Sequence, residues 1–530
     1  MQMSYFMAAG LCILIALAGA AGVSRFEFMP KKRVELRLAV LACIIFSIIY
    51  ASFSCLRYYQ LIYGIFDFGC NEDMIRTMAN FNGFMKGTIG GGGGYSEHFT
   101  PLAVFWVPFY WIWDSPYMLL IGQSVMLGAA GIPLYFCCRK MLKAPGWPLL
   151  IVMMYLLNPY LSRFTLYEYH MGSFYPLLFF SAWLAYLHHK KATFLLLLFA
   201  AITAKESFCI VTIAMGLYLC TRKKDLKLGI ACLGMTLLAV IFILFVWFPH
   251  IIPLQYHHVS RYPPVLGDSV AATINNLLKI AGLIFSGNSL SVILSLLIPF
   301  AFLPLLSWRV FLLLLLPVAF SQICSVNGHQ QLLISHYSDV LIPLLPLAAL
   351  LGLVRAQRFR NRPAWQRRMV LALCITMPLT ANVMFCELPH LKYHSYIPVY
   401  RTDRQLGIMS IPFNLKVLNY PRAAMFHEIK ECIPQNFTVC AQNNLGVFFL
   451  RHKGISLISN PQNPDFYVFD LKSFCGFDSI TVYQNLIKKV AVDPAYGCIY
   501  NTDGFMIFCR KTLLPPTQSP ATAPLMPGGK

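Results

Sequence analysis

The chain has 530 residues, of which 58% are hydrophobic and 12% are charged, and its formal net charge is +21. Soluble globular chains carry about twice this share of charged residues, so the composition excludes a soluble enzyme, a disordered protein and a disulfide-stabilised toxin. The basic residues are concentrated in short connections between apolar stretches, which is a membrane-topology signal rather than a sign of nucleic-acid binding. We therefore expect no nucleic-acid partner.

Long apolar stretches recur over the first 386 residues and predict transmembrane helices, because a helix needs about 20 apolar residues to cross the hydrocarbon core. The clearest stretches are 4–24, 38–56, 116–138, 228–248, 289–306 and 369–386. Shorter candidates are 147–161, 173–187, 310–325 and 340–354, and 193–220 is interrupted by Lys205 and Glu206. The predicted fold class is an α-helical polytopic membrane protein with about twelve transmembrane helices.

The basic residues also predict the orientation, because Lys and Arg accumulate in cytoplasmic connections. The basic connections are 25–37, 139–143, 188–191, 221–227, 309 and 355–368. To keep them on one side, 101–113 must lie along the outer surface, and 193–220 must form two short helices that turn at Lys205-Glu206. The protein is then a multi-pass protein of the cell inner membrane, with its N-terminus and C-terminal domain outside.

The composition changes from residue 387, where normal polar content replaces the apolar stretches. Short β-rich runs at 437–439, 454–458, 466–470 and 505–508 alternate with helical stretches near 422–433 and 480–490. This alternation predicts a small extracytoplasmic α/β domain. The predicted regions are an additional N-terminal transmembrane helix with a basic cytoplasmic loop (1–44), a transmembrane domain (45–386) with its first outer loop at 57–115, the α/β domain (387–512) and a disordered tail (513–530).

The first outer loop carries three carboxylates close to the end of a membrane helix, namely Asp67, Glu72 and Asp73. Acidic groups in this position are costly unless they face water, a cation or a substrate. Asp67 is the candidate general base, because it lies in an aromatic setting beside the span. The three carboxylates together are a candidate site for a divalent metal such as Mg²⁺ or Mn²⁺. The alternative is ordinary solvation of a loop.

Other polar groups of the predicted outer face are candidates for substrate binding, because they follow or precede membrane helices. They are Glu72, His98, Glu168, His170, Lys205, Glu206, Arg261, Tyr262, His336 and Tyr337. Lys205 and Arg261 are cations suited to a phosphate group, although Lys205 and Glu206 are also neighbours that could neutralise each other as a structural pair. If these groups converge, they form one cavity at the membrane surface.

At these positions the chain resembles the membrane proteins of domain of unknown function 2079, which are grouped with the type-C glycosyltransferases. The resemblance covers roughly 45–512. Its motifs here are Phe66-Asp67-Phe68-Gly69-Cys70-Asn71-Glu72-Asp73, His98-Phe99-Thr100-Pro101, Glu168-Tyr169-His170-Met171-Gly172, Lys205-Glu206-Ser207, Arg261-Tyr262 with Leu266-Gly267, and His336-Tyr337-Ser338. The segments IPQNFTVCAQNNLGVFFLRHKGI and PDFYVFDL also fit. The chain departs from the family pattern at Gly172 and Ser207, where the family has acids.

The resemblance implies a type-C-like fold and a membrane glycosyltransferase that moves a sugar from a polyprenyl-phosphate donor to an extracytoplasmic acceptor of unknown identity. It implies that Asp67 is the catalytic base and that Lys205 and Arg261 hold the phosphate. His98, Glu168, His170, His336 and Tyr337 would line the cavity. Two other classes remain open, a transporter or flippase of a lipid-linked or polar solute and a non-catalytic membrane scaffold.

Overall fold

The computed structural model describes most of the chain. The described residues are 2–23, 32–89, 98–142, 144–251, 268–285, 287–322, 333, 336–356, 364–385, 421–458, 463–471 and 480–513. The predicted site residues Arg261 and Tyr262, the predicted domain boundary at 386–387 and nearly all of the predicted tail lie outside these residues.

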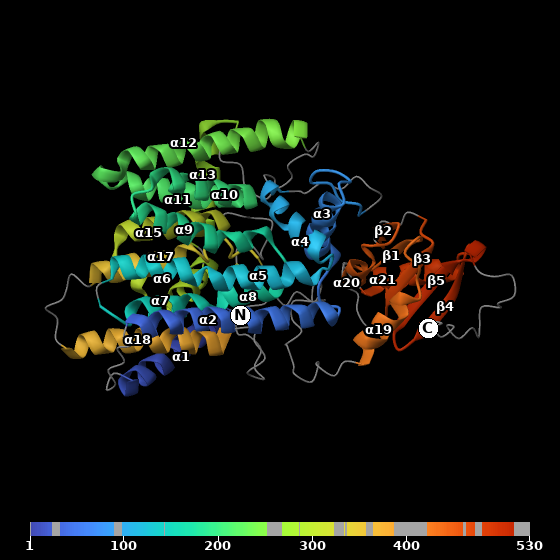
Figure 1. The fold of residues 1–530 in the computed structure, drawn as a ribbon, viewed down its shortest axis with the longest axis horizontal. Coiled ribbons are helices and arrows are strands. Elements are labelled where there is room, and N and C mark those ends of the chain that lie inside the picture. Colours follow the sequence, from blue (N-terminus) through green and yellow to red (C-terminus); the bar gives the residue numbers. More distant parts are fainter. Residues whose placement is uncertain are drawn as a thin grey trace.

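Helices make up most of the part of the structure that precedes residue 386, and most of them lie side by side along the long axis of the molecule, whereas α3 and α4 are inclined to it (Figure 1). In chain order they are α1 (Gln2–Val23), α2 (Lys32–Tyr59), α3 (Cys70–Ala79), α4 (Val107–Ile112), α5 (Tyr117–Ala129), α6 (Gly131–Met141), α7 (Trp147–Leu156), α8 (Pro159–Tyr167), α9 (Tyr175–Leu187), α10 (Lys191–Ala204), α11 (Cys209–Cys220), α12 (Leu226–Phe242), α13 (Val270–Ile284), α14 (Gly287–Leu297), α15 (Trp308–Gln322), α17 (Leu344–Ala356) and α18 (Ala364–Phe385). The predicted helical class is therefore correct.

The number of spans stays a prediction, because many apolar stretches are divided into shorter helices. Within the described residues, three helices are long and apolar enough to cross a membrane: Lys32–Tyr59, Tyr117–Met141 and Lys223–Ile251. A fourth would be the pair α7 and α8, which bends by 43°. Further apolar helices of 10–17 residues fall below this length.

Two of the predicted apolar stretches are interrupted in the structure, one as expected and one not. The stretch 193–220 forms two helices as predicted, because Lys205 is fully extended (φ −168°) and ends α10, and a short 3-10 turn (Glu206–Phe208) leads into α11. The stretch 289–306, expected to be one span, is broken instead. Ala301 and Phe302 adopt left-handed φ values of 49° and 55° between two 3-10 turns, which ends the helical run.

The C-terminal region is a small α/β domain built on a five-stranded sheet of order β2-β1-β3-β5-β4. Its elements are α19 (Pro421–Glu431), β1 (Thr438–Ala441), α20 (Asn443–Gly446), β2 (Gly454–Leu457), β3 (Phe466–Asp470), α21 (Ile480–Val492), β4 (Tyr496–Thr502) and β5 (Phe505–Arg510). β1 is parallel to β2 and β3, whereas β5 is antiparallel to β3 and β4. The sequence missed β4, whose last two residues are exposed and whose sequence lacks a clear apolar pattern.

The α/β domain lies at one end of the helical bundle, and α3 and α4 lie between the two (Figure 1). The end of α2 packs directly beneath it. The rings of Tyr58 and Phe448 stack with centroids 4.7 Å apart, and Nε2 of His427 is 2.9 Å from the carbonyl oxygen of Tyr59. One continuous cluster of buried apolar residues extends through both parts, and a second, smaller cluster lies within the α/β domain. This packing fixes the sheet against the first loop of the membrane domain.

Candidate functional site

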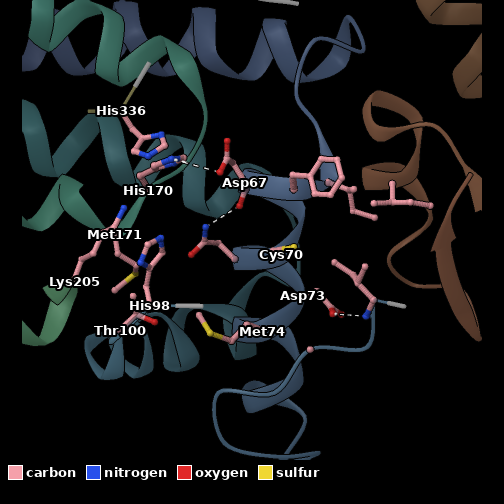
Figure 2. Close-up of a pocket in the computed structure, with 16 residues that line it drawn as sticks. Asp67, Cys70, Asp73, Met74, His98, Thr100, His170, Met171, Lys205 and His336 are labelled. Carbon is pink, nitrogen blue, oxygen red and sulfur yellow. Dashed lines mark hydrogen bonds and ion pairs between the residues drawn. The ribbon is translucent and has the colours of Figure 1, made fainter. Parts of the chain in front are cut away.

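A cavity of about 420 Å³ lies at this end of the bundle, between the first loop and the tips of several helices (Figure 2). Its polar lining residues are Asp67, Asn71, Asp73, His98, Thr100, His170, Lys205 and His336. Six residues predicted from the sequence, Asp67, Asp73, His98, His170, Lys205 and His336, therefore meet in one place although more than two hundred residues separate the first from the last. Leu457, at the end of β2, is the contribution of the C-terminal domain.

Asp67 reaches this cavity from a short π-helix, Ile65–Gly69, that joins the end of α2 to α3. Its side chain is 36% exposed, so a ligand can reach the carboxylate. The hydroxyl of Tyr167 donates a hydrogen bond of 2.7 Å to Oδ2, and Nε2 of His170 is 3.9 Å from Oδ1. One oxygen is thus fixed by a phenol, and the other faces an imidazole.

Glu168 binds the backbone of the same π-helix through hydrogen bonds. Its two carboxylate oxygens accept hydrogen bonds from the N–H groups of Gly64 (3.0 Å) and Phe68 (2.7 Å). Burial raises the pKa of Glu168, and the Asp67 carboxylate adds to the effect, whereas the two N–H donors oppose it. Glu168 is 7% exposed and is absent from the cavity wall, so it positions Asp67 rather than contacting a ligand.

Two imidazoles lie close together beside Asp67. The ring centroids of His170 and His336 are 4.0 Å apart, with the rings tilted by 44°, and the Tyr337 ring centroid is 4.2 Å from that of His336. Nδ1 of His170 is 2.6 Å from the carbonyl oxygen of Tyr169, so its Nε2 is the nitrogen that faces Asp67. Burial lowers the pKa of His170 to about 4, so this imidazole is neutral near pH 7.

Lys205 and His98 complete the opposite wall of the cavity (Figure 2). Glu206 accepts a hydrogen bond from the N–H of Phe99 at 2.8 Å, and its other oxygen is 2.7 Å from Nδ1 of His98. Glu206 is therefore used to hold the loop at His98, and not as a close ion-pair partner of Lys205. The Lys205 ammonium, whose residue is 8% exposed, is the cation of this cavity among the described lining residues.

The sequence departs from its family pattern at Gly172, and the structure shows what lies there instead. A Cβ atom built on Gly172 would be 2.9 Å from Oδ2 of Asp339. The Asp339 carboxylate thus occupies the space next to position 172, where the family pattern has an acid. A carboxylate is present at this place although the motif residue is glycine.

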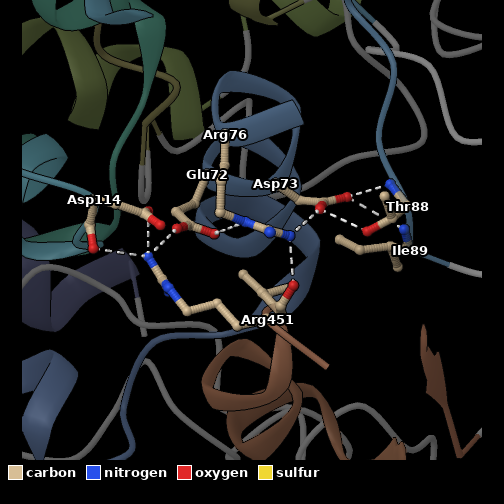
Figure 3. A network of polar contacts seen from close by, with 8 residues as sticks. Glu72, Asp73, Arg76, Thr88, Ile89, Asp114 and Arg451 are labelled. Carbon is tan, nitrogen blue, oxygen red and sulfur yellow. Dashed lines mark hydrogen bonds and ion pairs between the residues drawn. The ribbon is translucent and has the colours of Figure 1, made fainter. Parts of the chain in front are cut away.

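Glu72 and Asp73 have other partners than Asp67, although Asp73 also lines the cavity. Both belong to a network between α3 and the C-terminal domain (Figure 3). Within the described residues the three carboxylates form no common group of metal-ligand atoms. Glu72 is fully buried away from the cavity wall.

The network links the two domains through paired charges. Arg451, from the C-terminal domain, lies 3.3 Å from Oε1 of Glu72 and 2.7 Å from Oδ1 of Asp114. Arg76 pairs with Asp73 at 3.0 Å and also donates to the carbonyl oxygen of Leu450. Asp73 in addition accepts from the hydroxyl of Thr88 at 2.7 Å and from the N–H of Ile89 at 3.2 Å. These contacts hold the first loop against the C-terminal domain.

The stability of the protein should depend on pH through the buried Glu72 carboxyl group at this junction. Burial raises its pKa from 4.5 to about 7, although Arg451 and Arg76 oppose the shift. Between pH 4.5 and 7 the Glu72 carboxyl group keeps its proton in the folded protein but has lost it in the unfolded chain. The free energy of unfolding therefore falls as the pH rises from about 4.5 to 7 and then levels off. The Glu72 contribution is at most about 3 kcal/mol.

We therefore expect Glu72→Gln to flatten the dependence of the apparent Tm on pH between pH 5 and 7.5. Thermal unfolding in detergent, followed at several pH values for the wild type and the variant, checks this. Glu431→Gln is the matched control, because the Glu431 side chain is 73% exposed and pairs with Lys430 on the surface. An unchanged slope in Glu72→Gln contradicts the assignment.

The set of side chains suited to a metal is different from the predicted one. In the part of the chain that the structure describes, Asp67, His170 and His336 offer ligand atoms that all lie within 4.8 Å of one another. A carboxylate with two imidazoles suits Zn²⁺ or Mn²⁺ better than Mg²⁺, which prefers oxygen ligands. The neutral His170 has the protonation state that a ligand needs.

Sequence reasoning missed several residues of this site. Tyr167, which bonds Asp67, precedes Glu168 directly, and a search for phenols beside candidate acids would have found it. Asn71 donates to the carbonyl oxygen of Asp67 at 2.7 Å, and Cys70 and Thr100 line the cavity. The sequence indicated Asn71, Cys70 and Thr100 only through their positions inside the family motifs quoted above.

Comparisons with known proteins agree with the helical, apolar character of the bundle. The model of the family described as "Predicted membrane protein (DUF2079)" matches residues 57–506. The chain therefore belongs to this family of membrane proteins, as its motifs predict. No curated protein matches the chain.

Solved structures with a similar arrangement include two of ArnT from Cupriavidus metallidurans. The structure of ArnT bound to undecaprenyl phosphate has 11% sequence identity and a TM-score of 0.46, and the match covers 87% of this chain and 97% of ArnT. The structure in the apo state has 10% identity and a TM-score of 0.44, with the same coverage.

Proposed function

We propose that this protein is a membrane glycosyltransferase that moves a sugar from a polyprenyl-phosphate donor to an acceptor hydroxyl. The observation that carries the proposal is the meeting of one reachable carboxylate, three imidazoles and one lysine in a single cavity at the end of the bundle. A lipid-linked donor keeps its phosphate at the membrane interface, so its transferase needs a base and a cation at that depth.

The reaction assigns a role to each wall of the cavity. The acceptor oxygen attacks the anomeric carbon and gives its proton to Asp67, while the bond from that carbon to the phosphate oxygen breaks. The polyprenyl phosphate leaves with the bonding electrons, and Lys205 stabilises the negative charge that develops on it. Tyr167 orients the Asp67 carboxylate, and the imidazoles of His98 and His336 line the space for the sugar.

A divalent metal fits the same site. Asp67, His170 and His336 would hold it, and it would supply a Lewis acid for the departing phosphate. We further propose that the α/β domain and the cavity lie on the extracytoplasmic side of the inner membrane, as the basic connections predict.

A transporter has less support. Transport sites lie near the midplane of the membrane between broken helices, whereas this cavity is lined by the first loop, by residues at the ends of several helices and by Leu457 of the α/β domain. The two helices that meet at Lys205 do form a broken pair, but their turn faces the cavity at the end of the bundle.

Cys70 allows a test of lipid binding that requires no turnover. It is exposed and lines the cavity three residues after Asp67, whereas most of the other described cysteines are buried. We expect polyprenyl phosphate to slow the alkylation of Cys70 by a maleimide at least several-fold, measured by mass spectrometry of the labelled peptide. Cys432, which is also exposed but directly follows α19 and is not a lining residue of the cavity, is the internal control. Equal rates at Cys70 with and without the lipid contradict the proposal.

Transfer itself is tested with purified protein, a radiolabelled polyprenyl-phosphate sugar and membrane extracts as the acceptor source. We expect labelled product to appear with the wild type. Movement of intact donor across proteoliposomes without product would support a transporter instead, and the absence of both product and movement would support a non-catalytic scaffold.

A further inference from the structure

The N–H groups at the start of the Asp67 π-helix are held by two side chains from distant parts of the chain. The start of a helix leaves up to four N–H groups without a partner within the helix. Glu168 accepts from Gly64 and Phe68, as described above. The N–H groups of Ile65 and Phe66 both donate to Oδ1 of Asn443, at 2.9 Å and 3.1 Å. Asn443 belongs to the C-terminal domain, nearly four hundred residues away.

Asn443 is at the carboxyl edge of the C-terminal sheet. It begins α20 immediately after β1, and Leu457, which ends the neighbouring parallel strand β2, lines the cavity. In open α/β sheets this edge is where ligands bind. Here the first loop of the membrane domain occupies this edge instead. Ile65 packs against Gly446, since a Cβ atom built on Gly446 would be 3.1 Å from Cδ1 of Ile65.

Gly64 shows that the fit between the two domains is tight. A Cβ atom on Gly64 would lie 2.5 Å from Nδ2 of Asn443. Its backbone is extended (φ −116°), which any residue can adopt, so conformational freedom is not the reason for glycine. The close approach of the Asn443 amide is the reason.

We propose that Asn443 is a positioning residue for Asp67, so that the C-terminal domain is part of the catalytic machinery and not a separate module. The inference rests on the proposed role of Asp67 as the base. By fixing two consecutive N–H groups, Asn443 sets the rotation of the π-helix and therefore the direction of the Asp67 carboxylate. A displacement of about 1 Å at such a group costs roughly a hundredfold in rate.

A purely structural role would predict a different result. The domain is also docked by Arg451, through Glu72 and Asp114, and by the stacking of Phe448 on Tyr58. If Asn443 only helped docking, loss of Arg451 would affect catalysis in the same way as loss of Asn443. The two residues therefore form a matched pair in which only Asn443 contacts the Asp67 segment.

The test compares Asn443→Ala, Asn443→Asp, Gly64→Ala and Arg451→Ala in the full-length protein. We expect Asn443→Ala to lower kcat about 10- to 100-fold with an unchanged KM for the donor. Asn443→Asp should restore most of kcat, because an aspartate oxygen accepts both N–H bonds and is favoured at a helix start. Gly64→Ala should act like Asn443→Ala, and combining the two should add little.

Hydrogen exchange supplies a readout that does not depend on the reaction. We expect Asn443→Ala to speed exchange in a peptide covering 64–69, while a peptide covering 438–441 keeps its protection. Arg451→Ala should leave the 64–69 peptide protected and kcat within about threefold of the wild type.

The outcomes separate this inference from the proposed function. If the wild type transfers sugar and Asn443→Ala retains full kcat, the inference is wrong while the function stands. The inference is also wrong if Arg451→Ala lowers kcat as much as Asn443→Ala does, or if exchange at 64–69 is unchanged in Asn443→Ala. If the wild type shows no transfer in any assay but Asn443→Ala exposes 64–69, the positioning contact is real and the proposed function is wrong.

Discussion

Asp67→Asn should lower the rate of sugar transfer about 10²- to 10⁴-fold, which is the usual contribution of a general base. The amide keeps the size of the side chain and still accepts the hydrogen bond from Tyr167, so the cavity should persist. The measurement is the initial rate of product formation with a radiolabelled polyprenyl-phosphate sugar. Folding is checked by size-exclusion chromatography and by the apparent Tm.

Asp493→Asn is the control for this substitution, because Asp493 is an exposed carboxylate of the C-terminal domain. It should change the rate less than twofold. A folded Asp67→Asn protein with wild-type transfer would eliminate Asp67 as the base and leave the cavity without a carboxylate in that role.

Lys205→Met should lower kcat/KM for the donor about 10²-fold or more, because removal of a preorganised charge-stabilising group commonly costs this much. The methionine retains the length and the apolar stem of the side chain, so only the ammonium is lost. Lys205→Arg should retain part of the activity, since it keeps the positive charge but presents it in a different geometry. Steady-state kinetics over a range of donor concentrations separates the effects on kcat and KM.

Lys191→Met is the matched control for Lys205. Lys191 begins the same helix, α10, whereas Lys205 follows the other end of it, and Lys191 is exposed. It should leave the kinetics unchanged. Equal losses in both variants would show that α10 tolerates no substitution and would remove the case for Lys205 as the phosphate-binding group.

Much of the architecture could be predicted from the sequence because the physical signals were local. Charges at Lys205 and Glu206 inside an apolar stretch predicted a break, and the chain is extended at Lys205. Four of the five strands were predicted from short runs of β-branched and aromatic residues, which are typical of strands in a buried sheet. The break at Ala301 and Phe302 was missed because neither residue type favours left-handed backbone, so packing around the turn must impose it.

The site was predicted in part, because sequence position says which residues lie near the membrane end but not which way each side chain faces. Asp67 was predicted as the base and Glu72 as a substrate-binding residue, yet of the two only Asp67 lines the cavity, whereas Glu72 lies in α3 and pairs with Arg451. Asn443 lies inside the segment IPQNFTVCAQNNLGVFFLRHKGI, but nothing in that segment indicated its role. Its role depends on the docking of two domains, which no local pattern records.

We propose that this cavity binds the phosphate of a polyprenyl carrier between Asp67 and Lys205. The decisive experiment is a structure of the protein in nanodiscs with added polyprenyl phosphate. We expect phosphate density inside the cavity, within hydrogen-bonding distance of the Lys205 ammonium and close to the His170 and His336 imidazoles. A lipid phosphate bound elsewhere on the protein, with the cavity holding only water at saturating lipid, would show that the proposal is wrong.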